Sequence, residues 1–248
     1  MKINIDDFTE KSYEDILVEC KLKYNFITYQ NNSPELKSII LRHDVDMSPQ
    51  RALALAKIES KHNILSTYFF MLTSDFYNLL ELDNANVVKE IAHMGHKIGI
   101  HIDAKARMEG TNHNKSLDAL LMDEKACFEN FLTITPHAFS FHNPDVGQWL
   151  QVEDESIAGM FNAYSSKMKK EFKYCSDSNG YWRFDRLGDV VVTEHQKPLH
   201  ILTHPEWWVP SPMSPRDRIA RAANGRMSKC LERYDDFLNE NGRLNIGK

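Results

Sequence analysis

The amino-acid sequence predicts an α/β fold in which strands and helices alternate along one domain. Apolar runs of four or five residues are typical of buried strands, and the stretches between them carry apolar residues at helical spacing. Serine followed by proline opens two of the predicted helices, as an N-cap and a first-turn residue. Strands separated by helices favour a parallel sheet, and 248 residues are enough for either an open doubly wound sheet or a (β/α) barrel.

The boundaries of the elements follow from caps and apolar periodicity. Residues 6–31 are predicted to form a helix with a lead-in, and residues 38–41 an apolar strand that runs into the polar loop 42–46. Ser48 and Pro49 suit the N-cap and the first position of the next helix. The remaining expected elements are strands at 66–70, 97–101, 138–142, 189–193 and 199–204 and helices at 86–94, 116–132 and 214–239.

Nothing in the composition divides the chain into independent domains. Glycine and proline are scattered, and no internal repeat, low-complexity stretch or charge block separates two halves. We therefore expect a single domain spanning residues 1–248. Within it, residues 1–37 form a helical lead-in, residues 38–208 the core and residues 209–248 a C-terminal helix.

Composition and charge exclude several classes of partner. The 35 acidic and 30 basic residues give a net charge of -5, without a basic face suited to nucleic acid. The apolar runs are far shorter than the roughly 20 residues of a transmembrane segment. The acidic N-terminus lacks the pattern of a secretory signal, so a cytoplasmic location is expected. The four cysteines lie far apart without a CxxC pair, which predicts reduced thiols.

Histidines and carboxylates follow four of the predicted strands. In parallel α/β folds, ligands bind at the carboxyl ends of the strands. Because alternate residues of an extended chain share a face, Asp44 and Asp46 point the same way, as do His101 and Asp103. Four segments can thus converge on one pocket, and they supply His43, Asp44 and Asp46, then His101 and Asp103, then His142 and Asp145, and finally His204 and Glu206.

The side chains at these four strand ends are of the types that bind metal ions. Imidazole nitrogens and carboxylate oxygens without a nearby thiolate suit zinc, iron, cobalt or manganese, whereas calcium and magnesium need more oxygen ligands. A hydrolytic metal site needs about three protein ligands, an open position for water, a base and an acid for the leaving group. The strand ends supply enough groups for all of these, and zinc is the expected cofactor.

Two aromatic pairs lie beside the polar segments. Trp207 and Trp208 follow the loop of His204, and Tyr181 and Trp182 follow another polar loop. Flat aromatic faces beside hydrogen-bonding groups suit sugar rings. Trp207 is therefore a candidate for substrate binding, with core packing as the alternative for each of these rings.

The motifs in their order resemble those of a known family. LRHDVD, STYFF, GHKIGIH, FHNPD, YCSDSNGYWR and ILTHPEWW follow one another between residues 39 and 208. This order resembles the polysaccharide deacetylase family with the NodB homology domain, and within it the cytoplasmic members that begin with HDVD. The resemblance implies a distorted (β/α) barrel and the metal-dependent removal of an acyl group, usually N-acetyl from an amino sugar.

The resemblance also implies a role for each matching residue. The first aspartate of the family acts as a general base and matches Asp44, and the second is a metal ligand and matches Asp46. The first histidine of the family's HxxxH motif is a ligand and matches His101. The histidine of the late strand motif protonates the leaving amine and matches His204.

One position departs from the family pattern. The second histidine of the HxxxH motif is replaced by Lys105, whose ammonium group has no lone pair for a metal. Our hypothesis is that His142 completes the site, with Asp103 as the alternative ligand. A site that has lost both metal and activity is the third possibility.

The expected function is that of a metal-dependent hydrolase acting on an amino sugar or a sugar intermediate of surface glycan biosynthesis. Without an export signal, a nucleotide-linked or lipid-linked sugar is the expected substrate. Arg42, Asp177 and Arg183 are candidates for orienting the catalytic groups or holding the sugar. The alternatives are a catalytically silent sugar-binding protein, suggested by Lys105, and a metal-dependent esterase or amidase that acts on another small molecule.

Overall fold

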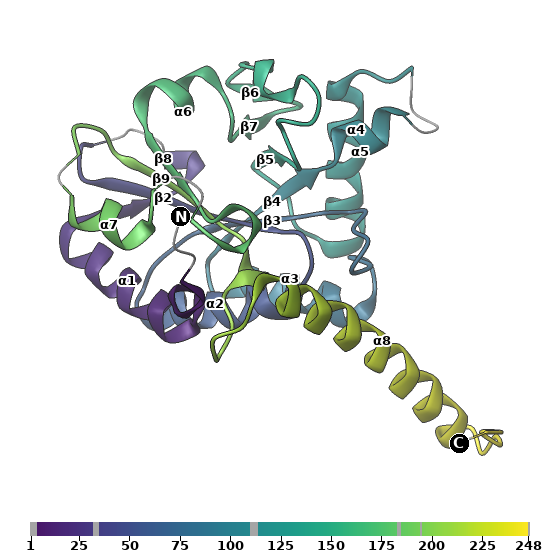
Figure 1. The fold of residues 1–248 in the computed structure, drawn as a ribbon. Coiled ribbons are helices and arrows are strands. Elements are labelled where there is room, and N and C mark those ends of the chain that lie inside the picture. Colours follow the sequence, from purple (N-terminus) through teal and green to yellow (C-terminus); the bar gives the residue numbers. More distant parts are fainter. Residues whose placement is uncertain (1–3, 32–34, 110–113, 183–184, 194, 248) are drawn as a thin grey trace.

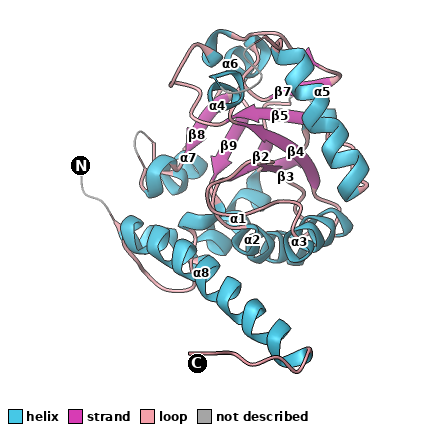
Figure 2. Cartoon of the chain, turned by 90° about the vertical axis from the view of Figure 1, so that its right-hand side faces the viewer, coloured by secondary structure: helices cyan, strands magenta, loops and turns pink. Residues whose placement is uncertain are grey.

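A predominantly parallel β-sheet forms the centre of the protein, and helices pack around it (Figure 1, Figure 2). The computed structural model describes residues 4–31, 35–109, 114–182, 185–193 and 195–247. The strands are β1 (Asn25–Ile27), β2 (Ser38–Val45), β3 (Thr67–Phe70), β4 (Lys97–Ile102), β5 (Ala138–Phe141), β6 (Ser156–Ile157), β7 (Met160–Asn162), β8 (Lys173–Ser176) and β9 (Leu199–Thr203). Their order across the sheet is β6, β7, β5, β4, β3, β2, β9, β8, and among these strands β6 alone pairs antiparallel.

Helices cover the outer face of the sheet in two groups. The helices are α1 (Glu10–Lys23), α2 (Pro49–Lys61), α3 (Leu82–His93), α4 (Ala104–Glu109), α5 (Leu117–Cys127), α6 (Ser166–Glu171), α7 (Leu187–Val192) and α8 (Pro215–Glu240). Ala52, Val88 and Leu120 bring α2, α3 and α5 into one core with β3, β4 and β5. Leu17 and Val190 bring α1 and α7 into a second core with β2 and β9. No helix in the described part of the chain is both long and apolar enough to cross a membrane.

The predicted α/β class with a distorted barrel is confirmed. Parallel strands alternate with outer helices, and the two end strands β6 and β8 do not pair with each other among the described strands, so the barrel is incomplete. Strand β1 lies beside the first residues of β2. The inner face is filled by a small apolar cluster that includes Tyr29, Ile40, Phe69 and Phe172.

Several elements differ from the sequence prediction. The first strand does not stop at Leu41 but continues to Val45, because its polar residues are buried and pair with β3. The predicted strand at 189–193 is wrong, since these residues belong largely to α7, and a short apolar run does not distinguish strand from helix. The predicted helix at 116–132 changes to a π-helical turn at Phe128–Leu132. The predicted helix at 6–31 is too long, since α1 ends at Lys23 and β1 follows it along β2. The short strands β6, β7 and β8 were not predicted either.

Strand β2 divides its side chains between the two faces of the sheet. Ile39, Leu41 and His43 face the outer helices, whereas Ile40, Arg42 and Asp44 face the inside. Every residue of the strand is buried. Since successive side chains alternate between faces, the polar segment of β2 must satisfy one polar network on each side.

The outer network centres on Glu59 of α2, whose side chain is fully buried. Its carboxylate lies 2.7 Å from His43 Nε2 and accepts hydrogen bonds from Ser66 Oγ at 2.6 Å, from Tyr68 Oη at 3.0 Å and from the hydroxyl of Tyr13. Burial acts to raise the pKa of Glu59, but His43 and the surrounding donors outweigh it and lower that pKa to about 2. The charged form of this carboxylate therefore ties α1 and α2 to strands β2 and β3.

Replacing Glu59 by glutamine is expected to lower the free energy of unfolding by about 2–4 kcal/mol at neutral pH, since it breaks a buried, hydrogen-bonded charge. Because the pKa of Glu59 is depressed in the folded state, its contribution is present above the ordinary value of 4.5 and is lost as the pH falls toward 2. Urea denaturation across this acid range should therefore show a flatter pH dependence for Glu59→Gln than for the wild type. The control is Glu90→Gln on the surface of α3, and an equal loss of stability in both variants would contradict the assignment.

Candidate metal centre

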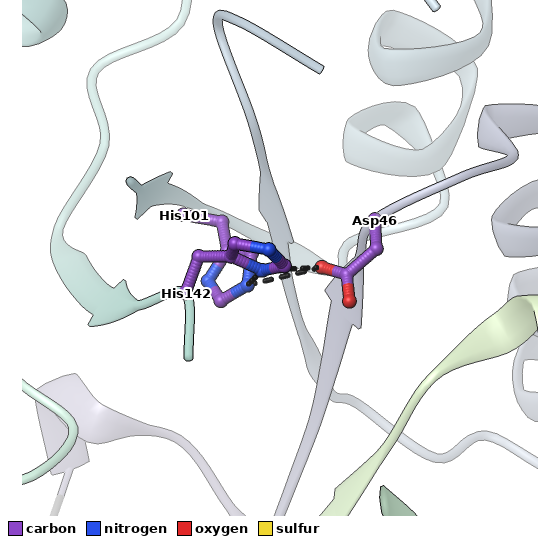
Figure 3. A group of neighbouring side chains, drawn as sticks. All are labelled: Asp46, His101 and His142. Carbon is purple, nitrogen blue, oxygen red and sulfur yellow. Dashed lines mark hydrogen bonds and ion pairs between the residues drawn. The ribbon is translucent and has the colours of Figure 1, made fainter. Parts of the chain in front are cut away.

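Three side chains from three strands meet at the carboxyl edge of the sheet (Figure 3). Asp46 directly follows β2, His101 lies in β4 and His142 directly follows β5. Asp46 Oδ1 lies 3.1 Å from His101 Nε2 and 3.4 Å from His142 Nδ1. The two nitrogens are 3.3 Å apart, so the three atoms form a nearly equilateral triangle.

The triangle fits a zinc-like ion. A tetrahedral zinc ion at about 2.0–2.1 Å from each ligand separates the ligand atoms by about 3.3–3.4 Å, close to the three observed separations. Asp46 Oδ1 is buried and has no well-formed hydrogen bond to the described chain. Such an atom is costly to bury, and a cation would satisfy it. Asp46, His101 and His142 therefore suit a divalent ion with a fourth position left for water or substrate.

The electrostatics of Asp46 agree with this arrangement. Burial acts to raise the pKa of its carboxyl group, but His101 and His142 outweigh burial and hold that pKa well below its ordinary value. The carboxylate is therefore charged, as a metal ligand must be.

The local backbone explains why the three residues meet. Asp44 lies on the inner side of β2, and Asp46, two residues further along and just past the end of the strand, lies on the same side. His101 lies opposite Ser140 in the parallel register of β4 and β5. The backbone N–H of His142 donates to Ile102 O at 2.9 Å, which continues this pairing beyond β5 and holds His142 beside His101.

A hydrogen-bond chain orients the imidazole of His101. His101 Nδ1 lies 2.7 Å from Ser140 Oγ, and Ser140 Oγ donates to Asp44 Oδ1 at 3.3 Å. With Nδ1–H donating to the serine, the Nε2 lone pair is directed at the metal position. Sequence reasoning missed Ser140, although its place two residues before His142 on the same strand face was a usable signal.

Asp44 is held from its other side by Arg42. Arg42 Nη2 lies 3.0 Å from Asp44 Oδ2 and 2.6 Å from the hydroxyl of Tyr164, and the guanidinium stacks over the Tyr164 ring at 4.5 Å. Burial acts to lower the pKa of Arg42, but Asp44 together with the neighbouring tyrosines, Tyr164 among them, outweighs burial and raises that pKa. The sequence hypothesis that Arg42 orients a catalytic group matches its position, whereas no sequence signal pointed to Tyr164.

A second histidine is paired with a buried carboxylate. His204 Nδ1 lies 2.7 Å from Asp177 Oδ1, and Asp177 also accepts from the backbone N–H of His204 and from the indole of Trp208. Burial acts to lower the pKa of His204, but Asp177 outweighs it and raises the pKa to about 10. Asp46 contributes to the same rise, so His204 lies within electrostatic reach of the Asp46 carboxylate.

A cavity of about 520 Å³ extends beside the candidate site toward α8. Its wall includes Met47, the residue after Asp46, and Glu206, two residues after His204. Glu206 is 2% exposed, and neither of its carboxyl oxygens has a hydrogen-bond partner in the described chain. Burial, with a smaller contribution from Asp46, raises the pKa of Glu206 well above its ordinary value.

The other sequence candidates lie elsewhere. Asp103 accepts a hydrogen bond from the backbone N–H of Ala106 and so caps α4, outside the ligand triangle. Lys105 is exposed on α4, 3.9 Å from Glu109. Trp207 is 5% exposed and packs in the core, so the expectation that its indole faces a sugar does not fit its position. Arg183 lies outside the described residues.

Comparisons with known proteins find similarity at the level of fold. No family model and no curated protein sequence matches the chain. Its structural neighbours are CE4 polysaccharide deacetylases and related proteins. One is a peptidoglycan N-acetylglucosamine deacetylase, with a TM-score of 0.45, 15% identity and coverage of 84% of this chain and 89% of that chain.

Two further structural neighbours are described as an esterase and as a pseudoenzyme. An acetyl xylan esterase from Clostridium thermocellum, solved with a cobalt ion, has a TM-score of 0.40 and 15% identity and covers 76% of this chain and 84% of its own. A CE4 family pseudoenzyme from Bacillus anthracis has a TM-score of 0.42 and 14% identity and covers 79% and 60%. At these identities the similarity concerns the fold and says nothing of activity.

The metal content of variants distinguishes His142 from Asp103 as the third ligand. After loading with zinc and removal of free ion, elemental analysis should find about one equivalent in the wild type and in Asp103→Ala. His142→Ala should bind zinc more weakly by more than about a hundredfold, because it removes a corner of the triangle. Retention of zinc by His142→Ala together with its loss from Asp103→Ala would reverse the assignment.

Proposed function

We propose that the protein is a metal-dependent hydrolase that removes an acyl group, N-acetyl above all, from an amino sugar. The observation that carries the proposal is the ligand triangle of Asp46, His101 and His142, with Asp44 bonded into its support and His204 within electrostatic reach. Hydrolysis at a metal site needs three ligands, a base and an acid, and these five residues match that requirement.

Asp44 is the proposed general base. When bound, a divalent ion polarises the acyl carbonyl and lowers the pKa of the attacking water. Asp44 accepts the proton of that water on one of its two carboxylate oxygens. Oδ1 is bonded to Ser140 and Oδ2 to Arg42, and each oxygen still has a second lone pair that can take the proton. Arg42 holds this carboxylate in one orientation, so little reorganisation is needed when the proton moves.

His204 is the proposed general acid. With its pKa raised to about 10, the imidazole carries both protons at neutral pH. Asp177 engages Nδ1–H, which leaves Nε2–H for the departing nitrogen. When the C–N bond breaks, the proton from His204 completes a neutral amine, and Asp177 stabilises the charged imidazole before transfer.

The cavity beside the site supports a negatively charged substrate. It is lined by six basic side chains from α2 and α8, against Glu81, Asp83 and the buried Glu206. Arg226 and Arg233 are paired with acidic residues of the α3 region, whereas Arg221 and Lys229 have no ion pair within the described chain. A phosphate or diphosphate attached to the sugar would fit this charge, which agrees with a nucleotide-linked or lipid-linked sugar intermediate.

The ligand triangle argues against the alternative of a catalytically silent sugar-binding protein. Lys105, which suggested a lost site, is exposed on α4, and His142 stands at the third corner of the triangle. This arrangement supports an ion site that does not need a second histidine in the HxxxH position. The esterase alternative shares the whole mechanism and differs only in the atom that leaves.

Acetate release from N-acetylated amino sugars, with and without an attached phosphate or nucleoside diphosphate, tests the proposal. We expect zinc-dependent release, faster for the phosphorylated sugars. Asp44→Asn and His204→Gln should each lower kcat by about 10²–10⁴-fold. His93→Gln, which changes an exposed histidine of α3, serves as the matched control. Release from acetyl esters alone, or binding of acetylated sugars by zinc-loaded protein without release, would contradict the proposal.

The pH profile of the same assay tests the acid. Because Asp177 raises the pKa of His204, Asp177→Asn should lower that pKa and move the alkaline limb of kcat to lower pH. Zinc content should stay unchanged, since Asp177 does not touch the ligand triangle. An alkaline limb that stays at the wild-type position would remove His204 from the acid role.

A further inference from the structure

Glu206 places a buried carboxyl group on the wall of the cavity beside the candidate site. Its side chain is almost fully buried, and neither carboxyl oxygen has a hydrogen-bond partner in the described chain. Native proteins keep few buried polar groups unpaired, because each one lowers stability. Glu206 is not among the proposed metal ligands, the base or the acid. Its carboxyl is therefore a candidate for bonding to a ligand in the cavity.

The backbone fixes Glu206 beside the proposed acid. Glu206 lies in a 3₁₀ turn of which His204 is the N-cap. The backbone N–H of Trp207 donates to His204 O at 3.1 Å, and that of Trp208 donates to Pro205 O at 3.2 Å. Both indoles are buried, so the turn cannot shift without leaving a void in the core. The carboxyl of Glu206 is thus held at one position of the cavity wall.

Donors that line the same cavity bond to other groups. The hydroxyl of Tyr77 donates to a backbone carbonyl at the end of β2 at 2.7 Å. The guanidinium of Arg51 donates to a backbone carbonyl at 3.0 Å and to Glu10 at 2.6 Å. Both Nη atoms of Arg218 donate to backbone carbonyls, at 3.3 Å and 3.2 Å. None of these side chains bonds to Glu206, so a partner for its carboxyl has to come from a ligand.

The chemistry of this carboxyl suits a hydroxyl group. Burial, with a smaller contribution from Asp46, raises the pKa of Glu206 well above its ordinary value and so favours the protonated form. A protonated carboxyl offers an O–H donor together with acceptor oxygens, and a hydroxyl offers the same combination. Every amino sugar carries hydroxyls. A phosphate would instead be attracted to Arg221 and Lys229 on the α8 side of the cavity.

We propose that Glu206 is a substrate-binding residue whose carboxyl hydrogen-bonds a hydroxyl of the sugar and so selects for sugars that carry it. This inference rests on the proposed function, because it takes the amino sugar as the occupant of the cavity. The cavity volume of about 520 Å³ is within the usual range of small-molecule sites. A site built to bond a hydroxyl rejects an analogue that lacks it, because the carboxyl is then left unpaired.

The stability of Glu206→Met separates a binding role from a structural one. Methionine has nearly the volume of glutamate and removes the unpaired oxygens from the interior, so the urea midpoint should rise. A residue that supports the fold would lower the midpoint when replaced. The matched control is Glu59→Met, which changes an equally buried but hydrogen-bonded carboxylate and should lower the midpoint.

Binding of deoxy sugars tests the selectivity. Zinc-loaded protein in an Asp44→Asn background, where turnover is slow, is titrated calorimetrically with N-acetylglucosamine 1-phosphate and its 3-, 4- and 6-deoxy analogues. With Glu206 present, at least one analogue should bind more than about tenfold more weakly than the parent sugar, and in Glu206→Met the two should bind within about twofold of each other. Glu206→Gln keeps a donor and an acceptor and should restore most of the discrimination.

Two controls accompany the titrations. Asp83→Asn removes a negative charge from the wall of the same cavity and should leave the discrimination unchanged. Zinc content should be equal in all variants, because Glu206 lies outside the ligand triangle. A loss of zinc from Glu206→Met would assign the residue to the metal site and contradict a role in binding the sugar.

Four further results would overturn the proposal. They are a lower urea midpoint for Glu206→Met, no binding of the parent sugar, equal binding of all four sugars when Glu206 is present, and discrimination that survives in Glu206→Met. Acetate release by the wild type together with any of them would leave the proposed hydrolase in place and remove only the role of Glu206. Discrimination that depends on Glu206 without acetate release would instead support the binding role and contradict the proposed reaction.

Discussion

The alternation of side chains along β2 is the constraint on which the rest of the structure depends. A single buried strand carries His43 outward to the Glu59 network and Arg42 and Asp44 inward to the candidate site, and Asp46 follows at its end. Since a strand cannot shift by one residue without exchanging its faces, the outer network fixes the register that aims the inner carboxylates. Stability and chemistry are therefore coupled through five consecutive residues.

The polar side chains on the inner side of β2 are also linked to those of the neighbouring strands by hydrogen bonds. Asp44 receives hydrogen bonds from Ser140 and Arg42, and Ser140 in turn orients His101. The proposed base and one proposed ligand thus share a single serine, so a displacement of either one is transmitted to the other. On the opposite side, Asp177 gathers His204 and Trp208 around one carboxylate, which fixes the loop after β9.

The sequence was informative where a pattern has a single physical meaning and less so elsewhere. Capping by Ser48 and Ser214 predicted the starts of two helices correctly. Polar residues at strand ends predicted that several segments converge, and Asp46, His101 and His142, selected among them with the help of the family resemblance, lie together. The run at 189–193 failed because short apolar segments suit both strand and helix. For Trp207 the sequence left sugar binding and core packing open, because burial depends on neighbours distant in sequence, such as Gly180, whose position against the indole leaves no room for a side chain. Tyr164 gave no local signal, since its surroundings are assembled from several segments.

X-ray absorption at the zinc edge of the loaded protein tests the central claim most directly. The account predicts a first coordination shell with two imidazole nitrogens and one carboxylate oxygen from the protein, and a spectrum of His142→Ala with one imidazole fewer in whatever zinc it retains. A wild-type shell with a single imidazole, or a His142→Ala spectrum identical to that of the wild type, would show that Asp46, His101 and His142 do not form the site.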